Sequence, residues 1–215
     1  METSIDEALT KKYIIERLAV NDKIESFDCG DYDLNDFILN ESTFFLKEKL
    51  AVSYVLKDKV EAQNVVAFFS LSNDKISITD FENKTKYNRF SKRFNNRKRL
   101  KSYPAVKIGR IGVSNSMKRK NIGSFLMNYI KTFFINDNKT GCRFLTVDAY
   151  ADAIPFYLKN GFVPLNHDDI KDKTRLLYFD LDDVEFWEFR VEGLELRVVE
   201  SVGCGVWSFK CWEWS

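Results

Sequence analysis

The chain has 215 residues, a formal net charge of +1 and 45% apolar residues, which is enough for one domain with a sizeable core. It contains one histidine, His167, and four cysteines that form no CxxC pair. These counts argue against a multi-histidine zinc site, a zinc ribbon or a redox dithiol, and we expect no metal. No run of about 18 apolar residues is present, so we expect no membrane span. Scattered cysteines without a secretory signal indicate reduced thiols in the cytoplasm.

Periodicity predicts alternating strands and helices, the arrangement of a single α/β or α+β domain. The expected strands cover residues 13–20, 51–57, 64–71, 105–113, 144–148, 162–164 and 174–181. Helices are expected from an N-cap at Asp33 to about residue 49, from 122 to 137, and from 152 to 160 with Gly161 as the left-handed cap.

The charge is distributed unevenly along the chain. The basic segment, Lys84–Lys101, contains nine basic and no acidic residues, so the rest of the chain has a net charge of −8. Such a segment indicates an anionic partner, and a solvated basic helix is the alternative. We expect it to be helical and to end before Pro104, because a residue that precedes proline disfavours the helical conformation. Tyr87, Phe90 and Phe94 in this segment are candidates for stacking on bases or for packing the helix on the core.

The C-terminal residues differ in composition from the rest. All four tryptophans lie in residues 183–215, which we expect to form an extension beyond a domain of residues 1–182. An aromatic-rich tail is typical of an extra strand pair or an association surface, including that of a homodimer, and a tail without a function of its own is the alternative.

The strand, turn and helix from Ile108 to Ile130 carry the most specific signal. A glycine at a helix start leaves backbone N–H groups free, and the helix dipole adds positive charge, so together they bind phosphate groups. The chain contains no GxxxxGK[ST] and no GxGxxG after a strand, which argues against a nucleotide triphosphatase and a dinucleotide dehydrogenase.

This segment, GRIGVSNSMKRKNIGSFLMNYI, resembles the acetyl-CoA motif of the GNAT N-acetyltransferase superfamily, a strand followed by a [QR]xxGx[GA] loop and a helix. About thirty residues downstream, VDAYADAIPFYLKNGFVPL resembles the second motif of the family, AxxFYxxxGF. FDCGDYDLNDFI and VVAFFSLS resemble a narrower branch, the GNAT toxins that acetylate aminoacyl-tRNA. The similarity covers roughly residues 12 to 182.

The resemblance implies a fold and a cofactor site. The fold is a mixed central sheet of about six to seven strands, flanked by helices, in which the central strands splay apart. The co-substrate is acetyl-CoA, whose pantetheine arm lies along the first motif strand and whose pyrophosphate lies on the amides of the loop. A backbone N–H near Val113 would polarise the thioester carbonyl. The residues implied in cofactor binding are Ile111, Gly112, Val113, Lys118, Arg119, Lys120, Asn121, Ile122, Gly123 and Ser124.

Three positions depart from the family pattern. Lys118 replaces the [QR] residue but keeps a positive charge, and Asn121 replaces the first loop glycine. Asparagine accepts a positive φ more readily than most residues. Tyr150 stands where the family often has asparagine. Gly123 matches, and a valine there is expected to abolish cofactor binding by crowding the pyrophosphate.

The resemblance also implies direct attack of an amine on the thioester, with Tyr157 of FYxxxGF as the acid that protonates the leaving thiolate. No general base is evident, because the strand at 105–113 has no carboxylate and His167 lies in a polar loop. An α-amine has a pKa near 8 and a lysine side chain one near 10.4, so deprotonating the lysine costs about 3 kcal/mol more. A site without a base therefore favours an α-amine.

The resemblance and the missing base favour the α-amine of an aminoacyl-tRNA as acceptor, with the basic segment on the phosphodiester backbone. Two alternatives stay open. One is a GNAT enzyme that acetylates a small amine or a protein N-terminus, and the other is a degenerate, non-catalytic GNAT domain that binds nucleic acid.

Overall fold

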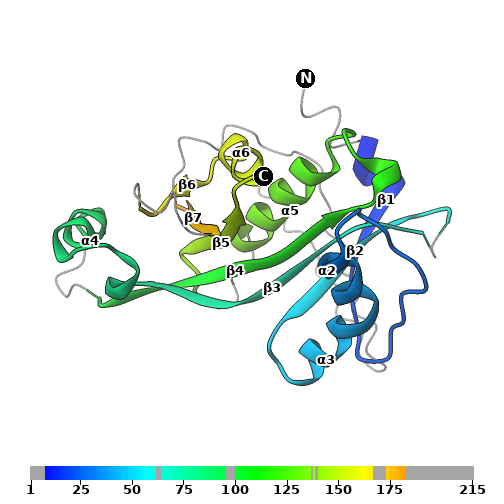
Figure 1. Ribbon diagram of the computed structural model, residues 1–215, viewed down its shortest axis with the longest axis horizontal. Helices are drawn as coiled ribbons and strands as arrows, with labels where there is room; N and C mark the ends of the chain where they lie inside the picture. The colour runs from blue at the N-terminus through cyan, green and yellow to red at the C-terminus, as the bar shows by residue number, and fades with distance from the viewer. Residues whose placement is uncertain are drawn as a thin grey trace, which may run out of the picture.

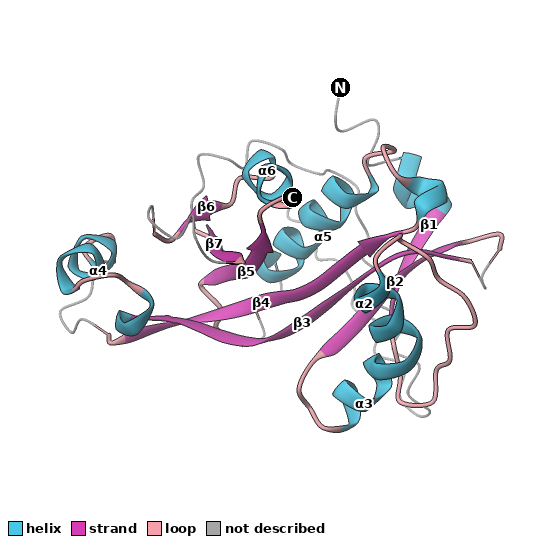
Figure 2. Cartoon of the chain, viewed as in Figure 1, coloured by secondary structure: helices cyan, strands magenta, loops and turns pink. Residues whose placement is uncertain are grey.

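The computed structural model of the chain describes residues 8–61, 64–94, 100–136, 138, 140–166 and 173–182. They form a seven-stranded sheet with the order β1-β2-β3-β4-β5-β7-β6 (Figures 1 and 2). The strands are β1 (Tyr13–Arg17), β2 (Val52–Asp58), β3 (Val65–Ser77), β4 (Ser102–Val113), β5 (Phe144–Tyr150), β6 (Val163–Pro164) and β7 (Thr174–Asp180). Only β4 and β5 pair in parallel, and the other neighbours are antiparallel. The expected mixed sheet is confirmed.

The helices are α2 (Tyr32–Asp36), η1 (Phe37–Glu41), α3 (Ser42–Lys47), α4 (Lys84–Ser91), α5 (Ile122–Asn136) and α6 (Ile154–Lys159), with short 3-10 turns at η2 (Ile78–Asp80) and η3 (Asn115–Met117). The expected N-cap at Asp33 is wrong. The carboxylate of Asp31 accepts the N–H of Leu34 (3.0 Å) and begins the helix two residues earlier. The helix expected there is also not continuous, since η1 is a π-helical turn between α2 and α3.

Alternate residues of β3 face opposite sides of the sheet. Phe69 belongs to the largest apolar cluster, with residues of α5 and α6. Phe68 packs with Phe37 of η1, and Ile76 packs with Tyr87 of α4. The three clusters therefore place α5 and α6 on one face of the sheet, and α2–α3 and α4 on separate parts of the other face. Figure 1 shows α5 and α6 on the opposite side of the sheet from α2 and α3.

The basic segment begins as a helix but ends sooner than expected. Helix α4 starts after Asn83, whose side chain accepts the N–H of Lys86, and it ends at Ser91. Pro104 lies inside β4, so the proline is part of the strand and does not mark the end of the helix. Tyr87 and Phe90 are buried, and the Tyr87 hydroxyl donates to the carbonyl of Leu100. These rings pack the helix on the sheet and are not available to stack on bases.

Lys131 of α5 is a buried cation (6% exposed). Its Nζ donates to the carbonyl of Asn160 (2.5 Å) and lies 4.3 Å from the ring centre of Phe179. Burial lowers its pKa from 10.5 to about 8. Between these values the unfolded chain binds a proton that the folded protein does not, so folding stability rises with pH.

We therefore expect the free energy of unfolding of the wild-type protein, relative to Lys131→Met, to rise by about 2 kcal/mol between pH 7.5 and 9.5. Urea unfolding of both proteins across this range measures the difference. Because the comparison is made at each pH, it cancels the titration of every other group. Parallel curves for the two proteins would contradict the lowered pKa.

Among the described residues no helix combines the length and the apolar character needed to cross a bilayer. Residues 183–215, with all four tryptophans, and His167 lie outside the described residues, so the expectations for them remain predictions.

Candidate active site

Strands β4 and β5 pair at three positions only, Ala105–Phe144, Val106–Leu145 and Lys107–Thr146. Beyond Lys107 and Thr146 both strands continue without pairing to each other, while β4 stays paired with β3 as far as Val113. The central strands therefore diverge, as the resemblance implied.

The free edge of β4 has polar groups that face the gap. The N–H of Ser114 donates to the carbonyl of Val66 on β3 (2.9 Å). Because backbone N–H and C=O groups alternate in direction along an antiparallel strand, those of Val113 and Ile111 point away from β3 and toward the side of β5. These are the residues expected to bind a pantetheine arm.

A β-bulge at Gly109 accounts for the divergence. Arg110 pairs with Ser70 and Ile108 pairs with Leu71, which leaves Gly109 without a partner on β3. A bulge bends its strand and increases the local twist, so β4 turns away from β5 just after their last pair. The extra residue also reverses the alternation of side chains along β4.

The turn between β4 and α5 is held by residues near the N-terminus. The N–H of Asn115 donates to the carbonyl of Asp28 (2.9 Å), and its Nδ2 donates to the Asp28 carboxylate (2.8 Å). Hydrogen bonds from the backbone of Gly30, then from Asn35 and Asn115, lower the pKa of Asp28. Sequence reasoning missed this anchor, although Asp28 lies in FDCGDYDLNDFI, one of the segments that carried the resemblance.

The loop before α5 has the conformation that its sequence suggested. Asn121 has a φ of 60°, in the left-handed region expected for the residue that replaces glycine. Arg119 also has a positive φ, 63°, which the sequence did not indicate.

The start of α5 fits a diphosphate. The first backbone hydrogen bond at the start of α5 runs from the N–H of Phe125 to the carbonyl of Asn121 (3.0 Å). Within the described part of the chain, the N–H groups of Ile122, Gly123 and Ser124 have no acceptor. Free amides at a helix N-terminus, together with the helix dipole, are the groups that bind anions in proteins, and the exposed side chains of Lys118, Arg119 and Lys120 add positive charge here.

Gly123 allows a close approach between α5 and α6. A Cβ atom at this position would lie 3.0 and 3.2 Å from two ring carbons of Phe156. The nearest obstacle to a side chain at residue 123 is therefore the Phe156 ring, which the sequence-based expectation of crowding at the pyrophosphate did not include.

We expect Gly123→Val to lower acetyl-CoA affinity tenfold or more, because overpacking costs about 1–3 kcal/mol and displaces the first turn of α5. Isothermal titration measures the affinity. Phe156→Ala combined with Gly123→Val should restore part of it, with Phe156→Ala alone as the control. A double variant that binds as weakly as Gly123→Val would place the crowding at the phosphate instead.

Tyr157, the expected acid, lies on α6 and is 5% exposed. Its ring centre is 5.2 Å from that of Phe156 and 5.5 Å from that of Phe162. Burial raises the pKa of Tyr157 to about 12. No hydrogen bond joins its hydroxyl to another of the described residues. The phenol therefore keeps its proton at neutral pH, as a proton donor must.

A carboxylate also lies where the strands part. Asp148 of β5, two residues beyond the last β4–β5 pair, forms an ion pair with Lys107 of β4. The sequence-based expectation of a site without a base considered the strand at 105–113 and did not include this carboxylate. Tyr150, at the end of β5, is 62% exposed.

The basic residues of α4 and its C-terminal turn divide into two groups. Lys84, Arg89 and Lys92 are exposed, and none of them forms an ion pair within the described residues. Lys86 forms an ion pair with Glu82, and Arg93 forms a hydrogen bond to Tyr178 of β7.

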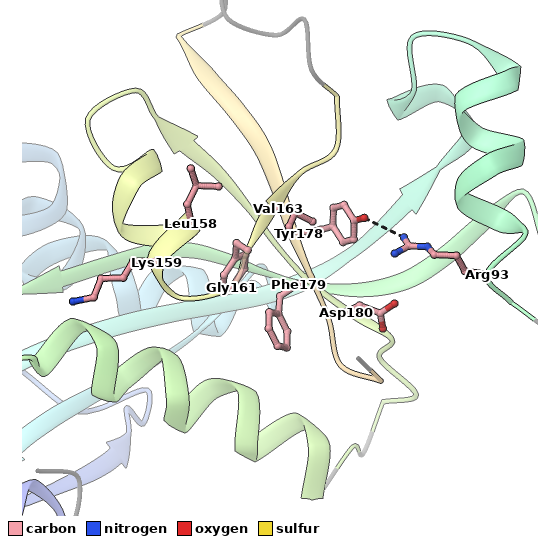
Figure 3. A pocket seen from close by; sticks show the side chains of 9 residues that line it. Arg93, Leu158, Lys159, Gly161, Val163, Tyr178, Phe179 and Asp180 are labelled. Atoms are coloured by element: carbon pink, nitrogen blue, oxygen red, sulfur yellow. Dashed lines mark hydrogen bonds between the residues drawn. The ribbon is translucent and has the colours of Figure 1, made fainter. Parts of the chain in front are cut away.

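Arg93 donates to the hydroxyl of Tyr178 (3.1 Å; Figure 3). Its guanidinium lies 4.5 Å from the ring centre of Phe90. A cavity of about 220 Å³ lies beside it, lined also by residues of α6, β6 and β7. None of the residues expected to bind the cofactor lines this cavity.

Comparison with known protein families agrees with this geometry. Residues 95–181 match the sequence model of the family described as "Acetyltransferase (GNAT) domain". This part of the chain is a GNAT acetyltransferase domain. The match includes β4, the loop, α5, β5 and α6, and it confirms the expected family, with N-acetyltransfer as its activity and acetyl-CoA as its co-substrate. No curated protein sequence matches the chain.

Three solved structures share the fold of this chain. "AtaT complexed with acetyl-methionyl-tRNAfMet" has a TM-score of 0.65 and 21% identity, and the match covers 81% of this chain and 98% of that one. A tyrosine-to-phenylalanine mutant of KacT has a TM-score of 0.66 and 21% identity, and the match covers 81% of this chain and 98% of KacT. "AtaTR bound with AcCoA" has a TM-score of 0.61 and 21% identity, and the match covers 82% of this chain and 98% of that one. At this identity the likeness establishes the fold.

Proposed function

We propose that the protein transfers the acetyl group of acetyl-CoA to the α-amine of an aminoacyl-tRNA. The observation that carries the proposal is the divergence of β4 and β5 beside the free amides of α5. The basic α4 helix and the solved structure of AtaT with acetyl-methionyl-tRNAfMet support tRNA as the acceptor.

Within this proposal the amides of Arg119–Ser124 hold the diphosphate, and the free edge of β4 holds the pantetheine arm. This edge runs from Ile108 to Val113 and is about 20 Å long at the usual rise per residue. Because the loop follows the C-terminal end of β4, the arm runs back along the strand toward Gly109. Bound acetyl-CoA supplies the acetyl group as a thioester.

Tyr157 holds a proton on its Oη and donates it to the sulfur that leaves. The N–H of Ile111 points into the gap on the Gly109 side of the edge, where it polarises the carbonyl that is attacked. The acceptor amine attacks in its neutral form, so no dedicated base is needed to activate it, and the proton that its nitrogen loses on forming the amide passes to solvent.

The pH dependence of the rate tests this assignment of roles. We expect log kcat/KM to rise with pH up to the pKa of the acceptor amine, near 8, and then to stay level, because Tyr157 keeps its proton to about pH 12. Rates measured from pH 5 to 10 give the profile. An additional acidic limb near pH 6 or below would show that an enzyme group acts as a base.

Labelled acetyl-CoA identifies the acceptor. The protein is incubated with charged tRNA, deacylated tRNA, total protein and polyamines in separate reactions. Label in charged tRNA alone is the expected result, and it should be released with the amino acid on mild alkaline hydrolysis. Label in the polyamine or protein fraction would contradict the proposal and favour the small-amine or N-terminal enzyme. An acetyl-CoA-dependent rise in Tm with no labelled product would favour the non-catalytic module.

The likeness to AtaT, described as a toxin bound to its antitoxin AtaR, extends the proposal to a toxin with an antitoxin partner. Growth arrest on expression of the wild-type protein, absent with Tyr157→Phe, is the expected result. We also retain the homodimer as a prediction, tested by sedimentation.

A further inference from the structure

Arg110 carries a cation that none of the described residues neutralises. It lies on β4 one residue after the Gly109 bulge. Its guanidinium carbon is 3.8 Å from the ring centre of Phe37 and 5.0 Å from that of Phe45. No carboxylate in the described part of the chain lies within ion-pair distance of it.

The two aromatic rings fix the guanidinium without using its hydrogen-bond donors. Phe37 is fully buried and begins the π-helical turn η1, a kind of turn that is frequent at functional sites. Stacking on a ring face occupies the plane of the guanidinium and leaves its edge, with the N–H groups, free. A half-buried arginine is thus held in place while none of the described residues uses its fork of donors.

The position of Arg110 relates it to the gap between the strands. Ala105 and Lys107 lie on the face that α4 covers, since Ala105 packs in the cluster with Tyr87. The bulge at Gly109 reverses the alternation, so Arg110 lies on this same face. On this one face of the sheet, α4 therefore packs near the start of β4, before the bulge, and the Arg110–Phe37 stack lies after the bulge. α5, which begins with the diphosphate site, covers the opposite face.

We propose that Arg110 binds a phosphodiester group near the 3′ end of the acceptor RNA and so positions its aminoacyl group at the gap between β4 and β5. The inference rests on the proposed function. A guanidinium fork matches two phosphate oxygens, and the exposed cations of α4 on the same face favour a polyanion over an isolated carboxylate. Asp148, on the adjacent strand β5, is paired with Lys107.

The test measures binding of a short single-stranded RNA that ends in CCA, at several salt concentrations, to the wild-type protein, Arg110→Gln and Arg110→Lys. Arg17→Gln, on the exposed edge strand β1, is the matched control. Acetyl-CoA affinity and Tm are measured for each protein. Acetylation of charged tRNA by the wild-type protein is measured in parallel.

We expect Arg110→Gln to weaken RNA binding about fivefold at 0.1 M salt and to reduce the slope of log Kd against log salt by about 0.7. Arg110→Lys should keep the slope and bind more weakly than the wild type, since it keeps the charge and loses the fork. Arg17→Gln should match the wild type. Acetyl-CoA affinity should be the same in all four proteins.

Unchanged RNA affinity and slope in Arg110→Gln, or no RNA binding by the wild-type protein, would overturn the inference. A loss of acetyl-CoA affinity in both Arg110 variants would also overturn it, by assigning the arginine to a coenzyme phosphate. RNA binding that depends on Arg110, in a protein that acetylates no charged tRNA, would refute the proposed function and leave the phosphate subsite in place.

Discussion

Tyr157→Phe is expected to lower kcat by about 100-fold or more and to leave acetyl-CoA affinity unchanged. General acid catalysis contributes about 10²- to 10⁴-fold, and the substitution removes the hydroxyl with little change of volume. The buried ring keeps its packing against Phe156 and Phe162. Steady-state rates with saturating acetyl-CoA, together with isothermal titration of acetyl-CoA, separate catalysis from binding.

Tyr129→Phe is the matched control. Tyr129 is also buried in the largest apolar cluster, burial raises its pKa too, and it lies on α5 among Phe69 and Phe133. Loss of its hydroxyl should leave kcat within about twofold of the wild type, since no catalytic role is assigned to it. Equal losses in the two variants would mean that the effect of Tyr157 is structural, and an unaltered kcat in Tyr157→Phe would remove it from the mechanism.

Neutralising the exposed cations of the basic segment is expected to have the second large effect. The triple variant Lys84→Gln, Arg89→Gln, Lys92→Gln should bind tRNA about 100-fold more weakly near 0.1 M salt. Its salt slope should fall by about 2 to 3, because each lost phosphate contact removes the release of about one counterion. Its affinity for acetyl-CoA should stay the same. Filter binding of tRNA across a salt series measures both quantities.

A control triple with the same composition replaces Lys11, Arg17 and Lys23, which are exposed near the N-terminal edge of the sheet. It removes the same charge, so it accounts for the effect of net charge alone. If both triples lose tRNA affinity equally, binding is nonspecific and the basic segment is not the tRNA surface.

The sequence predicted the strands and helices well where a single pattern dominates. The apolar spacing of α5 is a long, regular signal, and β2 is rich in β-branched and aromatic residues; both elements lie where expected. β3 begins as expected but continues to Ser77, six residues beyond its expected end. The helix after Asp31 was less predictable. Its apolar positions fit one helix, but the structure contains a π-helical turn from Phe37, whose ring stacks with Arg110. That turn depends on a tertiary contact, which the local sequence does not show.

The candidate site was predictable where it depends on one segment and hidden where it depends on two. The loop before α5 could be read from KRKNIGS, and Asn121 has the positive φ expected of it. The bulge at Gly109 could not be predicted, because a bulge is defined by the register of β4 against β3. The anchor between Asp28 and Asn115 joins residues 87 positions apart, and the pair of Lys107 with Asp148 joins two strands.

Hydrogen exchange with and without acetyl-CoA tests the central claim most directly. If the coenzyme binds along the free edge of β4 and on the first turn of α5, its addition should slow exchange of the amides of Ile111, Val113 and residues 119–124. The N-terminal part of β4, Tyr103–Val106, is paired with β3, and Ala105 and Val106 are paired with β5 as well. Exchange of these amides should not change. Protection confined to residues 158–163 and 178–180, around the cavity beside Arg93, or protection nowhere, would contradict the account.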